Sequence, residues 1–238
     1  MSEKKKVIML GNEAIARGAY EAGVKVSAAY PGTPSTEISE YLVQYKEELY
    51  CEWSPNEKVA TEVAIGASVA GVRAMSCMKH VGFNVAADPA YTVSYMGVNG
   101  GLVIVVADDP GLYSSQNEQD TRMVARAAQL PVLEPSDSFE AKEFMKQAFE
   151  LSEQFDRPFV FRTTTRLAHS QGVVELEDRE EVKDKPYEKD VRRTVMMPAN
   201  AKLRHIEIEK RNLELMEAAN TLSVNRVEMN DTKIGVIT

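Results

Sequence analysis

Short apolar runs alternate with longer stretches of helical periodicity over the first two thirds of the chain. The apolar runs lack polar alternation, which is typical of strands covered on both faces. Strands are predicted at residues 7–10, 24–29, 50–53, 73–78, 102–107 and 159–162, and helices at 12–22, 36–48, 56–71, 118–128 and 137–155. This alternation predicts βαβ units, and therefore a three-layer α/β/α fold on a mostly parallel sheet.

The composition changes near residue 172. Of the 19 residues from 175 to 193, 14 are charged, so a solvated linker or arm is expected there. A charged helix is predicted at 202–221. The apolar side chains that it places on roughly one side are Leu203, Ile206, Leu213 and Met216. Two interpretations stay open: a helix that lies on its own domain, or a strap that reaches a neighbouring domain or subunit.

The last residues, KIGVIT, resemble the opening strand of a further domain, because a strand needs partners that this stretch does not supply. We therefore expect a domain at 1–172, a charged helical arm at 173–230 and the first strand of a following domain at 231–238. On this interpretation the sequence is a fragment of a longer polypeptide.

Composition and charge exclude several classes of protein. Hydrophobic residues make up 44% and charged residues 27%, which suits a folded domain rather than a disordered chain. The net charge of −8 argues against a nucleic-acid partner. No segment reaches the roughly 18 apolar residues of a membrane span, and we expect a cytoplasmic protein without membrane contact. Cys51 and Cys77 cannot form a disulfide framework and are expected to be buried thiols.

Ligands of open parallel sheets bind beyond the carboxyl ends of the strands. The polar segments that fall there in the predicted sheet are residues 30–35, 53–57, 78–84 and 108–119. In the first, Pro31, Gly32 and Thr33 combine a fixed φ with a backbone that can pass close to a ligand. A rigid turn with a helix cap explains the same pattern, so both interpretations stay open.

Glu57 is the candidate carboxylate of the second segment. It lies in the first turn of the predicted helix at 56–71, where the helix macrodipole favours a negative charge. That helix is rich in small residues and can pack inside the protein, where a carboxylate can have a perturbed pKa. Plain electrostatics at a helix end is the alternative, and Glu62 is the competing carboxylate.

Two further segments carry charged groups. Lys79 and His80 follow a predicted strand and could hold an anion or donate a proton, although a structural histidine is the more ordinary interpretation. Asp108 and Asp109 could form a carboxylate pair or lie in a solvated loop. The sequence has neither GxGxxG nor GxxxxGK[S/T] and no metal-binding histidine spacing, so it supports no classical nucleotide site and no metal site.

Four stretches, taken in order, resemble the N-terminal part of the α subunit of indolepyruvate ferredoxin oxidoreductase, in the thiamine-diphosphate-dependent 2-oxoacid:ferredoxin oxidoreductase family. They are YPGTPSTEI, EWSPNEKVATEVAIGASVAGVRAMSCMKHVGFNVAADP, GGLVIVVADDPGLYSSQNEQDTR and RPFVFRTTTRLAHSQG. The resemblance is strong over about residues 5–172 and weaker over the charged arm. Pyruvate and 2-oxoglutarate relatives more often have YPITPS where this chain has YPGTPS.

The resemblance implies the fold of a pyrimidine-binding thiamine-diphosphate domain. It implies that Glu57 is the catalytic glutamate, which hydrogen-bonds N1′ of the aminopyrimidine, because the family's glutamate lies nine residues before the glycine that matches Gly66. The cofactor-binding residues that it implies are Pro31, Gly32, Thr33 and Glu57, and the substrate-binding residues are Lys79 and His80. Some relatives have an arginine where this chain has Asp108-Asp109, so that substrate or CoA contact cannot be carried over.

The implied activity is oxidative decarboxylation of aryl pyruvates to aryl-acetyl-CoA with reduction of ferredoxin. The family holds the diphosphate and its Mg²⁺ through a second domain with a GDG-type motif, and its iron–sulfur clusters through cysteines near the C-terminus of the α subunit; both motifs are absent here. The implied partners are a β subunit, ferredoxin, a 2-oxoacid and CoA, in a dimer of heterodimers. The fragment alone is expected to be inactive.

Three alternatives stay open. The first is another 2-oxoacid oxidoreductase, of the pyruvate or 2-oxoglutarate type. The second is a non-catalytic α/β binding or assembly module that keeps the fold without the thiamine chemistry. The third is a standalone CoA- or nucleotide-binding domain, which the lack of a phosphate loop disfavours.

Overall fold

A sheet of six parallel strands organises the protein. The computed structural model describes residues 5–229, 231 and 233–236. The strands lie in the order β3-β2-β4-β5-β7-β6, and every neighbouring pair is parallel. Their bounds are β2 Val26–Ala29, β3 Tyr50–Trp53, β4 Ala74–Lys79, β5 Leu102–Asp108, β6 Val132–Leu133 and β7 Phe159–Thr164. The predicted α/β fold with a mostly parallel sheet is confirmed.

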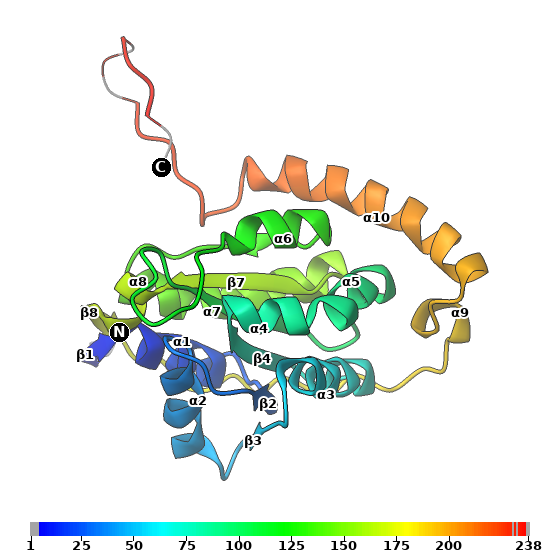
Figure 1. Ribbon diagram of the computed structural model, residues 1–238, viewed down its shortest axis with the longest axis horizontal. Coiled ribbons are helices and arrows are strands. Elements are labelled where there is room, and N and C mark those ends of the chain that lie inside the picture. Colours follow the sequence, from blue (N-terminus) through cyan, green and yellow to red (C-terminus); the bar gives the residue numbers. More distant parts are fainter. Residues whose placement is uncertain (1–4, 230, 232, 237–238) are drawn as a thin grey trace.

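Helices cover both faces of this sheet (Figure 1). One face carries α1 (Gly11–Glu21), α2 (Thr36–Leu42) and α7 (Ser138–Phe155). The other face carries α3 (Glu57–Ala70), α4 (His80–Val85), α5 (Ala87–Met96) and α6 (Thr121–Ala127). Side chains of β5 alternate between the two faces of the sheet. Val103 and Val105 pack in the core on the first face, and Ile104 and Val106 pack in the core on the other face.

Local sequence signals set several helix ends. The side chain of Asn56 accepts a hydrogen bond from Val59 N at 3.0 Å, which starts α3, and Asp137 caps α7 in the same way. Gly71, at a φ of 104°, ends α3 in the left-handed conformation. The helix predicted at 36–48 stops at Leu42, and a short 3₁₀ helix, η1 (Val43–Tyr45), follows it.

The first predicted strand lies outside the parallel sheet. β1 (Lys6–Leu10) pairs antiparallel with β8 (Gln171–Glu175) in a separate two-stranded ribbon. α1 follows directly at Gly11, where a Cβ would lie 2.1 Å from the carbonyl oxygen of Leu167. Glycine is therefore needed for this close approach, which ties the start of the chain to α8 (Thr165–His169) after β7.

Two helices lie where the periodicity predicts none. α4 and α5 occupy residues 80–96, between β4 and β5. α4 is only six residues long, and α5 carries Pro89 in its first turn, where the missing N–H of proline is tolerated. Because of these two features, the hydrophobic periodicity of the sequence does not predict either helix. The short elements β6, α8 and α9 (Val191–Thr194) are also unpredicted.

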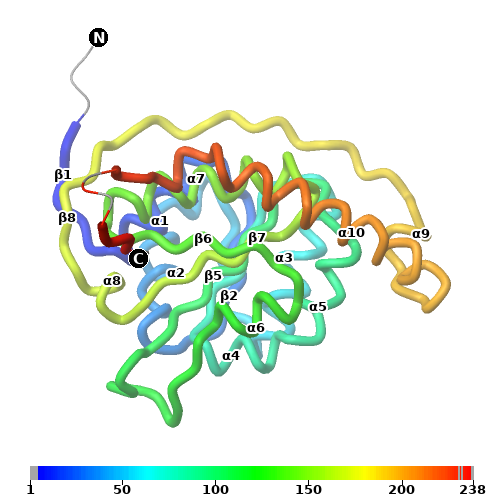
Figure 2. Tube along the Cα trace, turned by 90° about the horizontal axis from the view of Figure 1, so that it is seen from above, coloured from blue at the N-terminus to red at the C-terminus, as the bar shows by residue number. Residues whose placement is uncertain are grey.

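The charged arm lies on the domain as a strap. Residues 176–190 have no regular secondary structure and run from β8 to α9, past the amino ends of the parallel strands (Figure 2). Glu180 N donates to Glu21 O at 2.8 Å, and Lys185 N donates to Gly71 O at 2.9 Å. The strap thus exposes most of its charged side chains while its backbone is fixed to the domain.

α10 (Pro198–Ala219) also lies on its own domain, which was one of the two interpretations. Its side chain of Ile208 is buried, and Arg204 Nε donates to Tyr95 O of α5 at 2.7 Å. The four apolar side chains predicted on one side of this helix point away from the domain instead. The strand expected at 231–238 falls partly outside the described residues, and residues 233–236 are not in a strand. None of the described helices is long and apolar enough to cross a membrane.

Candidate functional site

The loop after β2 makes a tight turn at the carboxyl end of the sheet. Ser35 Oγ donates to Gly32 O at 2.7 Å, and Gly32 N donates to a threonine hydroxyl of α2 at 2.9 Å. Pro31 and Thr33 are exposed on this turn. A Cβ at Gly32 would lie 3.1 Å from Cβ of Lys79, so the turn touches the end of β4. The structure thus brings this turn and Lys79 together.

Glu57 lies at the start of α3 and reaches across to α4. Its side chain is half-buried. A Cβ at Gly82 of α4 would fall 2.4 Å from Glu57 Oε1, so the carboxyl group lies directly over that glycine. No described residue donates a hydrogen bond or forms an ion pair with this carboxylate. The helix end favours its negative charge.

The competing carboxylate, Glu62, occupies a different environment. It is exposed on the outer side of α3, 3.9 Å from the ammonium group of Lys58. Lys58 itself bonds Asp88 at 2.9 Å. Glu62 is therefore an ordinary surface residue, and of the two only Glu57 reaches α4 and the ends of the strands.

Lys79 and His80 are both buried and both contact the loop at 109–120. Lys79 Nζ donates to Ser114 O at 3.0 Å. His80 Nε2 lies 3.1 Å from Asn117 O, and because a carbonyl only accepts, this nitrogen carries the proton. His80 Nδ1 is buried without a partner among the described residues. The sequence predicts that both residues lie at the end of a strand. In the structure Lys79 is the last residue of β4 and His80 is the first residue of α4.

Asp108 and Asp109 correct both sequence interpretations, because they are buried and do not act as a pair. Asp108 accepts hydrogen bonds from Arg162 Nε at 2.7 Å and from Thr121 N at 3.1 Å. Asp109 accepts from the Ser115 hydroxyl at 2.6 Å and holds the loop that follows it. Burial alone would raise the pKa of Asp109, but hydrogen bonds from Ser115, from a backbone N–H and from a threonine together lower it to about 2.

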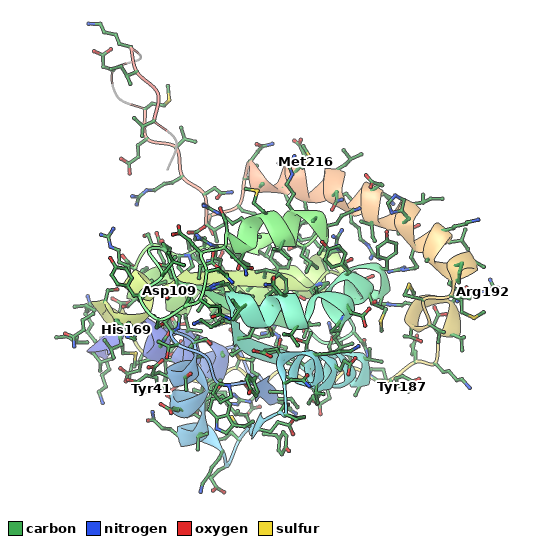
Figure 3. All side chains as sticks on the ribbon, in the orientation of Figure 1. Tyr41, Asp109, His169, Tyr187, Arg192 and Met216 are labelled. Atoms are coloured by element: carbon green, nitrogen blue, oxygen red, sulfur yellow. The ribbon has the colours of Figure 1, made fainter. Side chains whose placement is uncertain are left out.

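A cavity of about 630 Å³ opens at the carboxyl ends of β5 and β7, and sequence reasoning missed it. The residues that line it are Pro110, Tyr113, Thr164, Thr165, Arg166, His169 and Ser170. Figure 3 shows Asp109 and His169 at this same end of the molecule. The only signal in the sequence was the position of these residues after a predicted strand. No cluster of His, Cys, Asp and Glu able to hold a metal ion occurs among the described residues.

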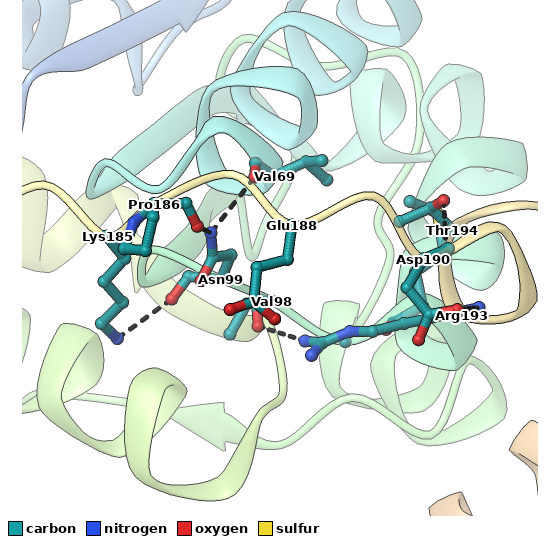
Figure 4. A pocket seen from close by; sticks show the side chains of 11 residues that line it. Val69, Val98, Asn99, Lys185, Pro186, Glu188, Asp190, Arg193 and Thr194 are labelled. Atoms are coloured by element: carbon teal, nitrogen blue, oxygen red, sulfur yellow. Dashed lines mark hydrogen bonds between the residues drawn. The ribbon is translucent and has the colours of Figure 1, made fainter.

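A second cavity, of about 350 Å³, lies under the strap at the opposite end of the sheet (Figure 4). Three of its polar residues, Asn99, Lys185 and Arg193, are already engaged in holding the strap and α9. Asn99 Nδ2 donates to Pro186 O at 3.1 Å, Lys185 Nζ donates to Asn99 O at 3.0 Å, and Arg193 donates to Val98 O. This cavity therefore lies between the strap and the domain, and it does not belong to the candidate site.

The two cysteines are free thiols on the sheet. Cys77 is fully buried in β4, as predicted, whereas Cys51 in β3 is only half-buried. Burial raises the pKa of Cys77 to about 12 and that of Cys51 to about 11. Neither thiol is a nucleophile at neutral pH.

Comparison of the sequence with known proteins places the chain in a family of oxidoreductases. The family described as "Pyruvate flavodoxin/ferredoxin oxidoreductase, thiamine diP-bdg" matches residues 17–230. The chain is 51% identical over 246 residues to indolepyruvate oxidoreductase subunit IorA of Archaeoglobus fulgidus, covering 99% of this chain and 39% of that protein. The IorA of Pyrococcus horikoshii is 49% identical over 98% of this chain and 37% of its own length.

More distant relatives support the same fold. The 2-oxoglutarate synthase subunit KorA of Methanothermobacter thermautotrophicus is 29% identical, over 73% of this chain and 48% of its own length. A 2-oxoglutarate:ferredoxin oxidoreductase structure from Magnetococcus marinus superposes with a TM-score of 0.73, covering 91% of this chain and 46% of that chain, at 18% identity. That likeness shows the fold.

The similarity to indolepyruvate oxidoreductase subunits extends over nearly the whole chain, whereas that to KorA is weaker. The chain spans about two fifths of the length of the IorA relatives that it matches. The resemblance stated from the motifs is therefore confirmed. The chain belongs to the thiamine-diphosphate-binding family of the pyruvate flavodoxin/ferredoxin oxidoreductases.

Proposed function

We propose that this chain is the pyrimidine-binding part of an indolepyruvate-type 2-oxoacid:ferredoxin oxidoreductase, and that Glu57 is the carboxylate that contacts N1′ of thiamine diphosphate. The observation that supports this proposal most strongly is the position of the Glu57 carboxylate. Its half-buried carboxylate lies over Gly82 with no hydrogen-bond donor among the described residues. Because a partly buried carboxylate without a donor is costly, a donor on a bound ligand suits it.

In the proposed reaction, Glu57, α3 and Gly82 each have a defined role beside the bound cofactor. Bound thiamine diphosphate supplies the nucleophilic carbon and the electron sink for decarboxylation of a 2-oxoacid. Glu57 shares a proton with N1′ of the ring and so controls the protonation of that nitrogen. Glu57 lies in the first turn of α3, and Gly82 leaves the space in which its carboxylate lies.

The neighbouring residues line the same space in this proposal. Pro31, Gly32 and Thr33 form the turn that faces the ring, with the exposed Thr33 hydroxyl free to bond a ligand. The ammonium group of Lys79 has three donors and gives one to Ser114 O, so it can also bind the carboxylate of the 2-oxoacid. His80 has only Nδ1 left, which can accept a hydrogen bond.

The rest of the reaction belongs to other parts of the complex. Mg²⁺ with the diphosphate, the iron–sulfur clusters and the contacts with ferredoxin and CoA are assigned to the β subunit and to regions that the longer relatives have beyond the matched part. The assembly is a dimer of heterodimers. The 238-residue chain alone is then expected to reduce no acceptor.

The test uses the α subunit at the length of its relatives, together with its β subunit. CoA-dependent reduction of a dye is followed with indolepyruvate, pyruvate and 2-oxoglutarate, with and without added thiamine diphosphate. The proposal predicts the highest kcat/KM with indolepyruvate and a dependence on the cofactor. A preference for pyruvate or 2-oxoglutarate would assign the chain to another branch, and no activity with any of the three would favour the non-catalytic binding module.

A further inference from the structure

Asp109 bonds the loop that follows it through a buried carboxylate, and the residue is only 1% exposed. Its Oδ2 accepts hydrogen bonds from Ser114 N at 2.8 Å and from the Ser115 hydroxyl at 2.6 Å. Its Oδ1 accepts one from the hydroxyl of Thr165, which follows β7, at 2.8 Å. Asp109 thus ties the loop at residues 110–119 to the carboxyl ends of β5 and β7.

The shape of this loop depends on contacts with other residues rather than on the preference of its own backbone. Most of its residues are exposed, and Leu112 has a φ of 58°, in the left-handed region that leucine rarely adopts. Within the described part of the chain, the side chains outside the loop that hydrogen-bond it are those of Asp109, Lys79 and His80. Of the three, Asp109 makes the most bonds.

Two carbonyl groups of the same loop are the partners of Lys79 and His80. Lys79 Nζ donates to Ser114 O at 3.0 Å, and His80 Nε2 donates to Asn117 O at 3.1 Å. Ser114 is therefore bonded twice, because its N–H donates to Asp109 while its carbonyl accepts from Lys79. A chain of two hydrogen bonds through one residue connects the Asp109 carboxylate to the Lys79 ammonium group.

Lys79 is held at two points along its side chain. Its stem lies against Gly32, where an added Cβ would be 3.1 Å from Lys79 Cβ and 3.4 Å from its Cδ. Its ammonium group is bonded to Ser114 O. A lysine that is already immobilised binds a carboxylate without the loss of affinity that comes from ordering a free side chain. The position of Ser114 O therefore affects how well Lys79 can bind an anion.

Asp109 does not occupy the remaining donors of Lys79. Lys79 forms no ion pair with any described residue, so two of its three N–H donors stay available. Burial alone would raise the pKa of Asp109, but its hydrogen bonds outweigh that effect, and the positive charge of Lys79 adds to the lowering. The carboxylate is thus ionised at neutral pH while its oxygens are taken up by the loop and by Thr165.

Asp109 is also not in a position to touch a ligand itself. It is buried, and both of its oxygens accept hydrogen bonds from the protein. Any effect of this carboxylate on a bound molecule must therefore pass through other residues.

We propose that Asp109 is a positioning residue for Lys79. Its carboxylate holds Ser114 so that the Ser114 carbonyl fixes the ammonium group, and this preorganisation raises the affinity of the site for the carboxylate of the 2-oxoacid. The effect on affinity rests on the proposed function, in which Lys79 binds that carboxylate. The positioning of Lys79, in contrast, depends only on contacts within this chain.

Reductive methylation of lysines, followed by peptide mass spectrometry, tests the positioning of Lys79 and needs no activity. The sample is the α subunit at the length of its relatives, together with its β subunit. In Asp109→Ala, Lys79 should be methylated about tenfold faster than in wild type, because its ammonium group loses its fixed partner. Lys142 is fully buried and serves as the internal reference, since its rate rises only if the whole domain opens. An unchanged rate for Lys79 in folded Asp109→Ala would overturn the proposal.

A milder variant covers the case in which Asp109→Ala does not fold. Ser115→Ala removes the hydrogen bond of 2.6 Å but keeps the carboxylate and its bond to Ser114 N. It should raise the methylation rate of Lys79 about threefold and leave that of Lys142 unchanged. Equal rates for Lys79 in wild type and Ser115→Ala, with Asp109→Ala unfolded, would also overturn the proposal.

Steady-state kinetics with indolepyruvate separates substrate affinity from turnover. Asp109→Ala should raise KM about tenfold and leave kcat within about threefold of wild type, because Glu57 and the turn at residues 31–33 form no hydrogen bond with the loop among the described residues. Asp109→Asn should recover most of the affinity, because its amide oxygen can still accept from Ser114 N and from the Ser115 hydroxyl.

The matched control is Asp156→Asn, at the opposite end of the sheet. Asp156 also accepts from a backbone N–H, that of Val98 at 2.7 Å, and it pairs with Arg193 at 2.6 Å. Asparagine tolerates the positive φ at this position. Loss of this charge should leave KM and the methylation rate of Lys79 unchanged. A tenfold rise in KM here would mean that any weakened carboxylate contact has this effect, and it would overturn the specific role of Asp109.

Lys79→Met shows whether Asp109 acts through Lys79. This variant should raise KM, and the further substitution Asp109→Ala should then change KM by less than about twofold. A tenfold rise from Asp109→Ala in both backgrounds would overturn the proposal, since Asp109 would act by another route. An unchanged KM in Lys79→Met would overturn the effect on affinity together with the proposed contact between Lys79 and the 2-oxoacid, whereas the methylation rates would still decide whether Asp109 positions Lys79.

Discussion

Replacement of Gly82 by alanine tests whether the position of the Glu57 carboxylate matters for catalysis. A Cβ at Gly82 would lie 2.4 Å from Oε1 of Glu57, 2.6 Å from its Cγ and 2.7 Å from its Cδ. Ordinary van der Waals contact begins near 3.4 Å. The difference of 3.4 − 2.4 Å means that the carboxylate must move by about 1 Å.

The magnitude of the effect follows from this displacement. A misplacement of about 1 Å in a reacting group costs on the order of 100-fold in rate. The backbone tolerates the change, because Gly82 lies within α4 and does not have a positive φ. In a helix, alanine is more favourable than glycine by roughly 0.5–1 kcal/mol. We therefore expect kcat/KM to fall about 100-fold while the melting temperature stays the same or rises.

The assay is CoA-dependent dye reduction by the α subunit with its β partner, combined with thermal unfolding. Gly66→Ala is the matched control, because Gly66 also lies in a helix but a Cβ there meets nothing within 4 Å. It should gain similar stability and keep its activity. Wild-type activity in folded Gly82→Ala would refute the reasoning, since the carboxylate would then have moved without consequence.

Three further predictions concern buried groups. Lys142→Met breaks a fully buried ion pair with Glu21, at 2.9 Å, and should lower the free energy of unfolding by about 3 kcal/mol. This loss corresponds to a fall of about 6–12 °C in melting temperature. The control, Lys210→Met at the surface, should lower the free energy of unfolding by less than about 0.5 kcal/mol. Asp109→Asn should lower the free energy of unfolding by about 1–2 kcal/mol at pH 7, measured by denaturant unfolding. Because the pKa of Asp109 is lowered to about 2, the difference in stability between wild type and variant should shrink as the pH falls from about 5 towards 2. Cys77, with its pKa raised to about 12, should react with a thiol reagent at pH 8 only as fast as the protein unfolds.

The strands and the carboxyl-end segments were predictable because their signals are local. The buried runs of β4 and β5 have no polar alternation, and Asn56 and Asp137 cap their helices through their own side chains. Parallel strands place their following loops at one edge, so Glu57 and Lys79 could be placed on the same edge of the sheet without a structure.

Other features depend on contacts between distant parts of the chain. The pairing of β1 with β8 joins residues more than 160 positions apart, and no local pattern encodes it. The direct contact of Glu57 with Gly82 needs α4, a helix too short to give a periodicity signal. The burial of Asp109 could not be predicted either, since its hydrogen bonds come partly from Thr165, after β7.

The arm shows how periodicity can place residues on one side of a helix without saying what that side meets. The spacing of Leu203 and its apolar neighbours predicts a common face, and the structure confirms one. The contact with the domain, however, comes from Ile208, which is buried, and from Arg204 and Arg211, whose guanidinium groups reach backbone carbonyls and Asp156. Long charged side chains can thus help to dock a helix while four of its large apolar side chains stay exposed.

If Glu57 acts on the cofactor, Glu57→Gln and Glu62→Gln must differ in activity. Both substitutions lie on α3, remove one negative charge and keep the size of the side chain, but only Glu57 lies over Gly82. With indolepyruvate and the complete complex, we predict a loss of about 100-fold or more in kcat for Glu57→Gln, and activity within about twofold of wild type for Glu62→Gln. Equal activity in the two variants, with both proteins folded, would show that Glu57 does not act on the cofactor.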